Sequence, residues 1–175
     1  MNDAKREKIN KLASIVRDAC NLEIPIDLDR AVCCLQGKIK RENNADFEAK
    51  VEKVDDGFVI SVAAEASGKR ERFSIAHELG HLFLHMGYMI DEDKWRNTSD
   101  YHDSVYYRFG HSIEEYEAHE FAAALLMPRD EFIEIAKKNL NGDAYSVAPI
   151  AEYFDVTVSA AKTRGRWLGL FSWDD

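Results

Sequence analysis

Apolar positions recur with helical spacing over several stretches of the chain. Residues 3–20 place Ile, Leu and Val side chains three and four positions apart, with charged residues between them. Pro25 interrupts this pattern, and Asp27 then stands where the N-cap of a short helix through Leu35 is expected, before Gly37. The same periodicity predicts later helices over 70–86, 112–127, 129–140, 146–154 and 158–168.

Between residues 45 and 64 the pattern changes to alternation of apolar and polar side chains. Asp56-Gly57 supplies a turn, so this stretch predicts a β-hairpin. Its second strand, 58–62, is more uniformly apolar and is expected to lie deeper. Residues 87–111 show no clean period, and connections of this length usually serve a function. A hairpin with about six helices indicates an α+β fold.

Length and composition place the chain among globular proteins. Its 175 residues, 46% of them hydrophobic, predict one domain over 1–175, with helices at about 145–170 as an appended part. The longest nearly uncharged apolar run, 121–128, is far short of the ~20 residues that a membrane span needs. A net charge of −9 disfavours direct binding of nucleic acid. No apolar segment of a secretory signal follows the first residues, so a cytoplasmic protein is expected.

The cysteines number three, an odd count. Cys33 and Cys34 are adjacent, and no CxxC pair is present, so spacing predicts no metal cluster. For a cytoplasmic protein, reduced thiols at Cys20, Cys33 and Cys34 are the expectation.

The segment from Arg72 to His85 contains an HExxH motif, formed by His77, Glu78 and His81, inside a helical pattern. Side chains four residues apart lie above one another on a helix, so both imidazoles can reach one tetrahedral metal ion. Glu78 stands beside them and can accept a proton from water. The alternative interpretation is a half-buried helix with two unrelated histidines.

Two properties of this helix weigh against that alternative. It is apolar around the motif, so imidazoles on it are largely buried and need partners. Gly80, in the middle of the helix, costs up to about 1 kcal/mol relative to Ala, which indicates a close approach by another helix or strand.

A catalytic zinc site needs a third protein ligand, and the next predicted helix offers carboxylates. Glu117 is spaced four and eight residues from Phe121 and Leu125, so it shares the inward face of an apolar helix. A carboxylate there is costly unless it is paired or binds a cation. Glu115, and to a lesser degree Glu114, are expected to be solvated first-turn residues that favour the positive helix end.

The sequence RFSIAHELGHLFLH (72–85), followed by EYEAHEFAAALLMP (115–128), resembles the ImmA/IrrE family of metallo-endopeptidases. Members of that family usually combine a similar HExxH helix with an E-A-N-x-F-A-A-x-L-L-M-P helix. Residues 25–28 resemble the family's entry to its second helix, and 150–161 with 164–170 resemble its C-terminal helices. The resemblance therefore extends over nearly the whole chain.

This resemblance implies a zincin-like core in which a hairpin or small antiparallel sheet packs on the HExxH helix. It implies one Zn²⁺ per chain, although ligand type leaves other divalent metals open. His77 and His81 are then zinc ligands, Glu117 is the third ligand, and Glu78 is the general base.

The family resemblance also implies a protein substrate: a helix-turn-helix transcriptional repressor of a mobile element or stress circuit. A separately encoded partner would then supply DNA binding. The strand 58–62 is expected to present an edge to which an extended peptide adds.

The chain departs from the family pattern in two places. His119 stands where the family usually has Asn, and 63–65 lacks the Asn usual at the end of the strand before the motif. The first departure concerns the residues that surround the metal ligands, and the second concerns the affinity for a peptide substrate.

The remaining histidines and several tyrosines are weaker candidates. His85, four residues after His81, is expected to be a core residue or to support a ligand, because side chains stacked on one helix do not converge on one ion. His119, His102 and His111 are candidates for contacts with the residues around the metal ion or with the substrate. The candidate donors to a developing oxyanion are Tyr101, Tyr106, Tyr107 and Tyr116.

Two other functions remain open at this point. One is a non-catalytic metal-binding regulatory or antitoxin-like interaction module, which does not require Glu78. The other is a DNA-binding regulator that uses Lys162, Arg164 and Arg166, which the acidic total disfavours. Trp167 and Trp173 are expected to be packing residues.

Overall fold

A computed structural model describes residues 1–43, 45–66, 68–98, 100–101 and 112–173 of the chain. Within these residues the helices are α1 (Asp3–Ala19), α2 (Leu28–Cys34), α3 (Gly68–Leu84), α4 (Glu92–Asn97), α5 (Ile113–Leu126), α6 (Arg129–Lys138), α7 (Val147–Tyr153) and α8 (Val158–Trp167). The strands are β1 (Gly37–Glu42), β2 (Ala49–Val54), β3 (Gly57–Ala63), β4 (Asp100–Tyr101), β5 (Leu140–Asn141) and β6 (Ala144–Tyr145). The predicted α+β class is confirmed.

The larger sheet has the strand order β1-β3-β2-β4. β3 pairs with β1 in parallel and with β2 antiparallel, while β2 pairs with β4 only at Val51 and Glu52. Alternate apolar residues of β2 and β3 are buried because one face of the sheet packs on α3, and Ser61 of β3 is buried as well. The buried apolar side chains of these two strands are Ala49, Val51, Phe58, Ile60 and Val62.

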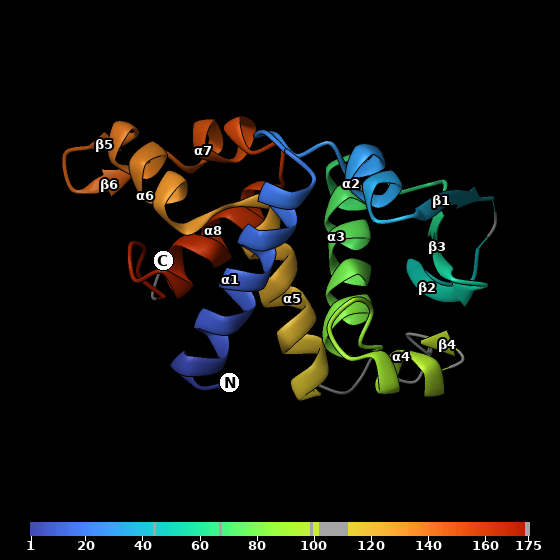
Figure 1. Cartoon of the computed structure of the whole chain (residues 1–175). Helices are drawn as coiled ribbons and strands as arrows, with labels where there is room; N and C mark the ends of the chain where they lie inside the picture. Colours follow the sequence, from blue (N-terminus) through green and yellow to red (C-terminus); the bar gives the residue numbers. More distant parts are fainter. Residues whose placement is uncertain (44, 67, 99, 102–111, 174–175) are drawn as a thin grey trace.

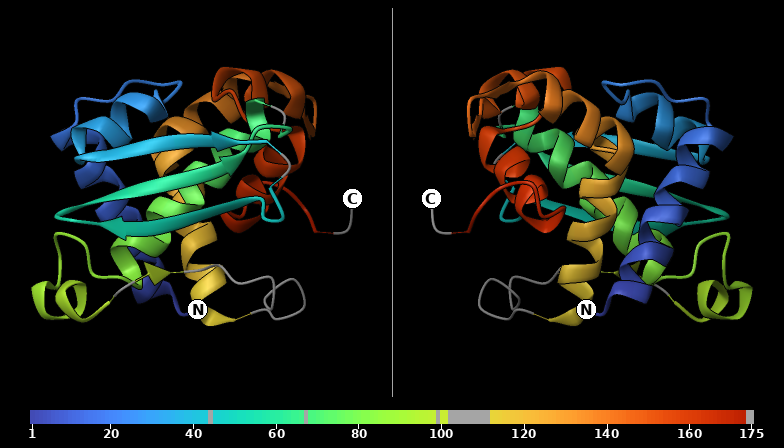
Figure 2. Two further views of the ribbon diagram at one scale, coloured as in Figure 1. Left: turned by 90° about the vertical axis from the view of Figure 1, so that its right-hand side faces the viewer. Right: turned by 90° about the vertical axis from the view of Figure 1, so that its left-hand side faces the viewer.

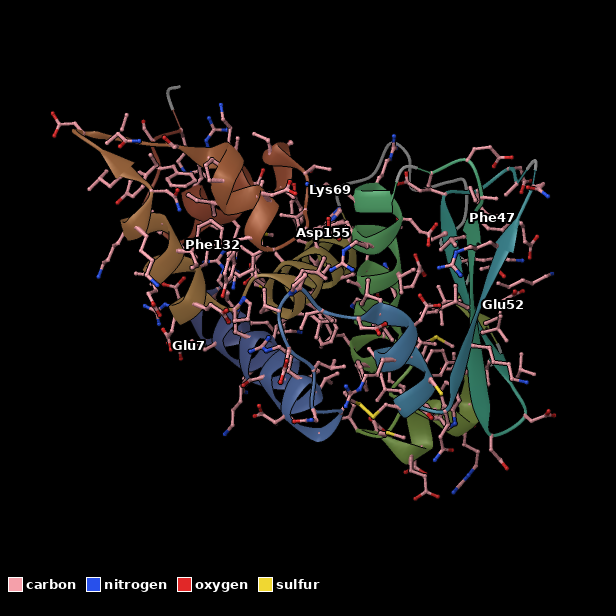
Figure 3. The ribbon with its side chains drawn as sticks, turned by 90° about the horizontal axis from the view of Figure 1, so that it is seen from above. Glu7, Phe47, Glu52, Lys69, Phe132 and Asp155 are labelled. Atoms are coloured by element: carbon pink, nitrogen blue, oxygen red, sulfur yellow. A yellow bond between two sulfur atoms is a disulfide. The ribbon has the colours of Figure 1, made fainter. Side chains whose placement is uncertain are left out.

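The elements form successive layers (Figures 1 and 2). The sheet lies against one side of α3, and α5 lies beside the other side of α3, followed by α1 and the C-terminal helices. Seen from above, Phe47 and Glu52 mark the sheet side and Phe132 marks the opposite side (Figure 3). Lys69, at the start of α3, forms an ion pair of 4.0 Å with Asp155 between α7 and α8. α3 and α5 are therefore the inner helices, which explains why both are apolar on most sides.

The two inner helices approach most closely at Gly80 and Ala118. A Cβ atom at Gly80 would lie 2.8 Å from the Cα of Ala118, closer than two carbon atoms can pack. The expectation that Gly80 marks a close approach by another helix is confirmed. Phe83 and Phe121, one turn beyond, continue the contact with ring centroids 5.6 Å apart.

Several local predictions differ from the structure. The turn of the predicted hairpin consists of Asp55 and Asp56, with Asp55 at φ 53°, one residue earlier than expected. The strand 58–62 lies inside β3, between β1 and β2, so the expectation that it offers a free edge is wrong. β1, α4 and the small β5–β6 hairpin were not predicted, because short elements carry too few residues to show a period.

The cysteines also differ from expectation. Cys20, the C-cap of α1, and Cys34, the last residue of α2, form a disulfide with their Cα atoms 5.9 Å apart. Cys33 is a free, exposed thiol. The prediction of three reduced thiols is therefore wrong for Cys20 and Cys34, since the turn at Pro25 brings together two residues that are distant in sequence.

A buried ion pair holds the C-terminal helices to the inner pair. Arg164 of α8, only 2% exposed, donates hydrogen bonds to Glu120 of α5, to Asn10 of α1 and to the carbonyl of Met127. Because each charged group is paired and hydrogen-bonded, the burial of both is tolerated. Arg164 is therefore a structural residue.

The contact at Gly80 yields a test of the fold. Gly80→Ala is expected to lower the free energy of unfolding by about 1–2 kcal/mol, since crowding against Ala118 outweighs the gain in helix propensity. Urea unfolding of the metal-free protein followed by circular dichroism measures it. Gly68→Ala, where a Cβ meets nothing within 4 Å, is the matched control and should leave stability unchanged or slightly higher. Equal effects of both substitutions would contradict the close-packing explanation.

Candidate metal centre

The helix α3 places the two histidines of the HExxH motif on one face. His77 and His81 are 8% and 0% exposed, and their Nε2 atoms lie 2.9 Å apart. One helical turn separates the residues, so their rings are directed to one point at the side of the helix. That point faces the first turn of α5, because α5 crosses α3 at Gly80.

A carboxylate from α5 completes this arrangement. One oxygen of Glu115 lies 3.2 Å from Nε2 of His77, and its other oxygen lies 3.2 Å from Nε2 of His81. Glu115 and the contact residue Ala118 are three positions apart, so they share the face of α5 that meets α3. The hydroxyl of Ser112 caps α5 by accepting a hydrogen bond from the Glu115 backbone N–H.

The structure therefore brings Glu115, and not the expected Glu117, to the two imidazoles. Glu117 is inward-facing as predicted, at 6% exposure, but two residues rotate a helical side chain by about 200°. Its Oε2 lies 3.5 Å from Nε2 of His85, and its Oε1 lies 2.9 Å from Nζ of Lys5. The apolar stripe of α5 does not show which carboxylate faces the imidazoles, because α5 is buried against both α3 and α1.

Sequence reasoning assigned Glu115 to solvent because a first-turn carboxylate suits the helix dipole. The signal that identifies it is its spacing from Ala118, a small residue that pairs with Gly80 across the helix contact. This spacing identifies Glu115 only when α3 and α5 are known to cross at Gly80 and Ala118.

Glu78 follows His77 on α3, and its side chain is deeply buried, at 1% exposure. Burial of a carboxylate is costly without compensation by the surroundings, so a purely structural helix has little reason to place an acid here. The position is adjacent in sequence to a residue of the candidate metal centre, as the motif predicts.

His85 lies one turn after His81, on the side away from His77. Its Nδ1 is 2.9 Å from Nδ1 of His81, while the Nε2 of His81 faces Glu115. The structure thus places His85 behind His81, in contact with the ring nitrogen that does not face the centre.

His119 lies one helical turn after Glu115 on α5, with its ring centroid 4.5 Å from that of His77 and 5.7 Å from that of Phe73. It lines an open groove of about 870 Å³ between α3, α5 and α8. The aromatic side chains of the groove wall are Phe73, Tyr116, His119 and Trp167. Tyr116 and Trp167 are 45% and 48% exposed, and Trp167 packs edge-on against Trp173, with ring centroids 5.4 Å apart. The lining of the groove is largely apolar and contains none of the three donors, so the groove reaches the candidate metal centre only through His119, which contacts His77.

Charges near the groove entrance are compensated. Glu48, just before β2, accepts hydrogen bonds from Arg70 and from the hydroxyl of Ser74. These bonds, the one from Arg70 above all, lower the pKa of Glu48. The entrance beside His77 is thus lined by an ionised carboxylate.

The buried side chains have shifted pKa values. Desolvation lowers the pKa of His81 to about 4, so its ring is neutral at pH 7 and retains a lone pair for a cation. Hydrogen bonds with His77 and His81 hold the pKa of Glu115 well below its usual range. Neutral imidazole and ionised carboxylate are the protonation states that a metal site requires.

The spacing of these donors fits a divalent metal ion. One atom each from His77, His81 and Glu115 lie within 4.8 Å of one another, the only such group found in the described parts of the chain. Ligand atoms of a tetrahedral zinc lie about 3.3 Å apart, close to the 2.9 and 3.2 Å seen here. Two imidazoles and a carboxylate with one coordination position left open are typical of catalytic zinc.

Other predicted candidates fall outside this view. His102, His111, Tyr106 and Tyr107 lie outside the described residues, as does the side chain of Tyr101.

Among the described helices, none combines the length and apolarity that a membrane span requires.

Comparison with protein families gives one match over most of the chain. Residues 38–165 match the family model of a peptidase group, described as the IrrE N-terminal-like domain. This range includes all three donors of the candidate metal centre and Glu78. A comparison with curated proteins gives no significant match.

Among solved structures, a Mycobacterium tuberculosis transcriptional regulator is similar in fold. The two chains share 19% sequence identity, with a TM-score of 0.60 over 90% of this chain and 46% of the regulator. The present chain thus corresponds to less than half of that protein.

The lowered pKa of His81 predicts how stability depends on pH. Between pH 6.5 and 4.5 the unfolded chain takes up a proton at this residue while the folded protein does not, so the free energy of unfolding falls as pH falls. His81 contributes at most about 1.4 kcal/mol per pH unit. Unfolding of the metal-free protein at several pH values should show a smaller slope for His81→Gln than for the unsubstituted chain. Identical slopes would contradict the buried neutral state.

Proposed function

Because this chain belongs to the peptidase family of IrrE N-terminal-like domains, we propose that it is a zinc-dependent endopeptidase that hydrolyses a peptide bond in a protein substrate. The observation that carries the proposal is the convergence of His77, His81 and Glu115. In this assignment Glu115 replaces Glu117 as the third metal ligand, and Glu78 acts as general base.

The chemistry divides between the cation and the chain. A divalent cation held by the three ligands supplies Lewis-acid chemistry, lowering the pKa of water and polarising a carbonyl. The Glu78 carboxylate accepts the proton of the attacking water and returns it to the leaving amine. The buried setting of Glu78 strengthens these charge interactions because water is excluded.

The groove beside His77 supports a polypeptide substrate. Its volume of about 870 Å³ is enough for several side chains, and its aromatic wall favours apolar ones. Because β3 lies between β1 and β2, an extended substrate cannot add to the strand 58–62. A helix-turn-helix repressor of a mobile element or stress circuit remains the proposed substrate.

A second candidate, a non-catalytic metal-binding regulatory or antitoxin-like module, is favoured by the structural likeness to a transcriptional regulator. Direct DNA binding through the C-terminal cations is disfavoured, since Arg164 is buried and paired with Glu120.

The role of Glu78 separates the two candidates. Glu78→Gln is expected to retain one zinc per chain but to reduce cleavage at least about 100-fold, because the amide cannot accept the proton. Zinc content is measured by atomic emission, and cleavage by mass spectrometry of a proteome-derived peptide library. The zinc-loaded, unsubstituted chain is tested on the same library and, where a repressor is encoded beside it, on that repressor. If the chain cuts neither, the regulatory module is favoured.

The ligand assignment has its own test. Glu115→Ala is expected to lower zinc affinity by more than the roughly 10–100-fold typical of residues that only support a ligand. Glu114→Ala, an exposed residue on the same helical turn, is the matched control and should change affinity little. Competition with a chromophoric chelator gives both affinities. Comparable losses for the two variants would show that Glu115 is not a ligand.

A further inference from the structure

A chain of polar contacts runs from the surface of α1 to the candidate metal centre. Lys5 Nζ lies 2.9 Å from Glu117 Oε1, Glu117 Oε2 lies 3.5 Å from His85 Nε2, and His85 Nδ1 lies 2.9 Å from His81 Nδ1. Exposure of the side chains falls along this path, from 49% for Lys5 to 8%, 6% and 0%. The contacts join three helices, α1, α5 and α3.

A cation held at this centre would fix where the protons of the two imidazoles lie. His81 directs Nε2 toward His77 and Glu115, so a lone pair offered to a cation at that atom requires the proton of His81 to be on Nδ1. Nδ1 then donates to Nδ1 of His85, which must accept. The proton of a neutral His85 is therefore on Nε2, the atom that faces the Glu117 carboxylate.

Each member of the path has a defined task. The Glu117 carboxylate, 3.5 Å from His85 Nε2, favours the tautomer with the proton on that atom, and the ammonium group of Lys5 stabilises the partly desolvated carboxylate. Orientation of a metal-bound imidazole by an acceptor behind it raises ligand basicity and holds the ring in place. Glu114 and Lys94 also act electrostatically on His85, in opposite directions.

We propose that Lys5, Glu117 and His85 are positioning residues that set the tautomer and orientation of His81, so that α1 is a working part of the metal centre. This inference rests on the proposed function. It assigns a role to a helix that lies outside the region matched by the family model, which begins at residue 38. It also gives Glu117, displaced from the ligand set, a reason to be inward-facing.

Zinc affinity is the first measurement, made on the full chain by competition with a chromophoric chelator. Glu117→Leu, which removes the acceptor, is expected to weaken Zn²⁺ binding by about 10–100-fold. Glu117→Gln, whose amide oxygen still accepts from His85, should recover most of that loss. Lys5→Met should weaken binding in the same direction but less, and Lys8→Met, an exposed position on the same helix, should match the unsubstituted chain.

A purely structural role predicts a different result. If Glu117 served only packing, Leu and Gln would both bind Zn²⁺ like the unsubstituted chain, with changes only in the urea midpoint of unfolding. Unchanged zinc affinity of Glu117→Leu would overturn the inference.

The tautomer is the second measurement, made on the chain loaded with Zn²⁺. Long-range ¹H–¹⁵N spectra should show the His85 proton on Nε2, with loss of this preference in Glu117→Leu. A His85 proton on Nδ1 in the zinc-loaded chain would overturn the inference and leave the proposed function intact. If the unsubstituted chain bound no zinc, the proposed function would fail, and the inference that rests on it would fail with it.

Discussion

The close crossing of α3 and α5 is the constraint on which the metal centre depends. Without a side chain at Gly80, the backbone of α5 approaches α3 at Ala118. Helical rotation about that point then distributes the polar residues of α5: Glu115 to the two imidazoles, Glu117 to the side of α1, and His119 to the groove. A single small contact thus determines which carboxylate meets which histidine.

The sheet and the outer helices keep this crossing in place. β2 and β3 bury their apolar face on α3, and α1 covers α5 from the opposite side. The inner helices are therefore surrounded by apolar side chains, which lower the local dielectric constant. Interactions among the few polar groups between the two helices are stronger as a result. Their lone pairs and charges are directed toward one another instead of toward water.

Much of this arrangement can be predicted from the sequence where the signal is local. The helices of HExxH and of the EYEAHEFAAALLMP stretch, the strands flanking Asp56, and the close approach at Gly80 all follow from periodicity, turn chemistry and residue size. The choice between Glu115 and Glu117 does not, because both carboxylates are consistent with helical spacing. It depends on which face of α5 meets α3, and α5 contacts α1 as well. The Cys20–Cys34 disulfide is missed for the same reason, since spacing along the chain carries no information on how α1 and α2 meet.

The pair formed by Arg164 and Glu120 sets the minimum fragment that can be used in biochemical work. Glu120 lies on α5 only five positions after Glu115, and its charge is balanced by Arg164, near the end of the chain, and by Arg6 of α1 at 3.4 Å. A shortened chain that stops before position 164 loses the buried cation and leaves Arg6 alone to balance the desolvated acid, and breaking such a buried pair costs up to about 3–5 kcal/mol. Expression fragments, domain fusions and crystallisation trials therefore need a C-terminal boundary placed beyond α8.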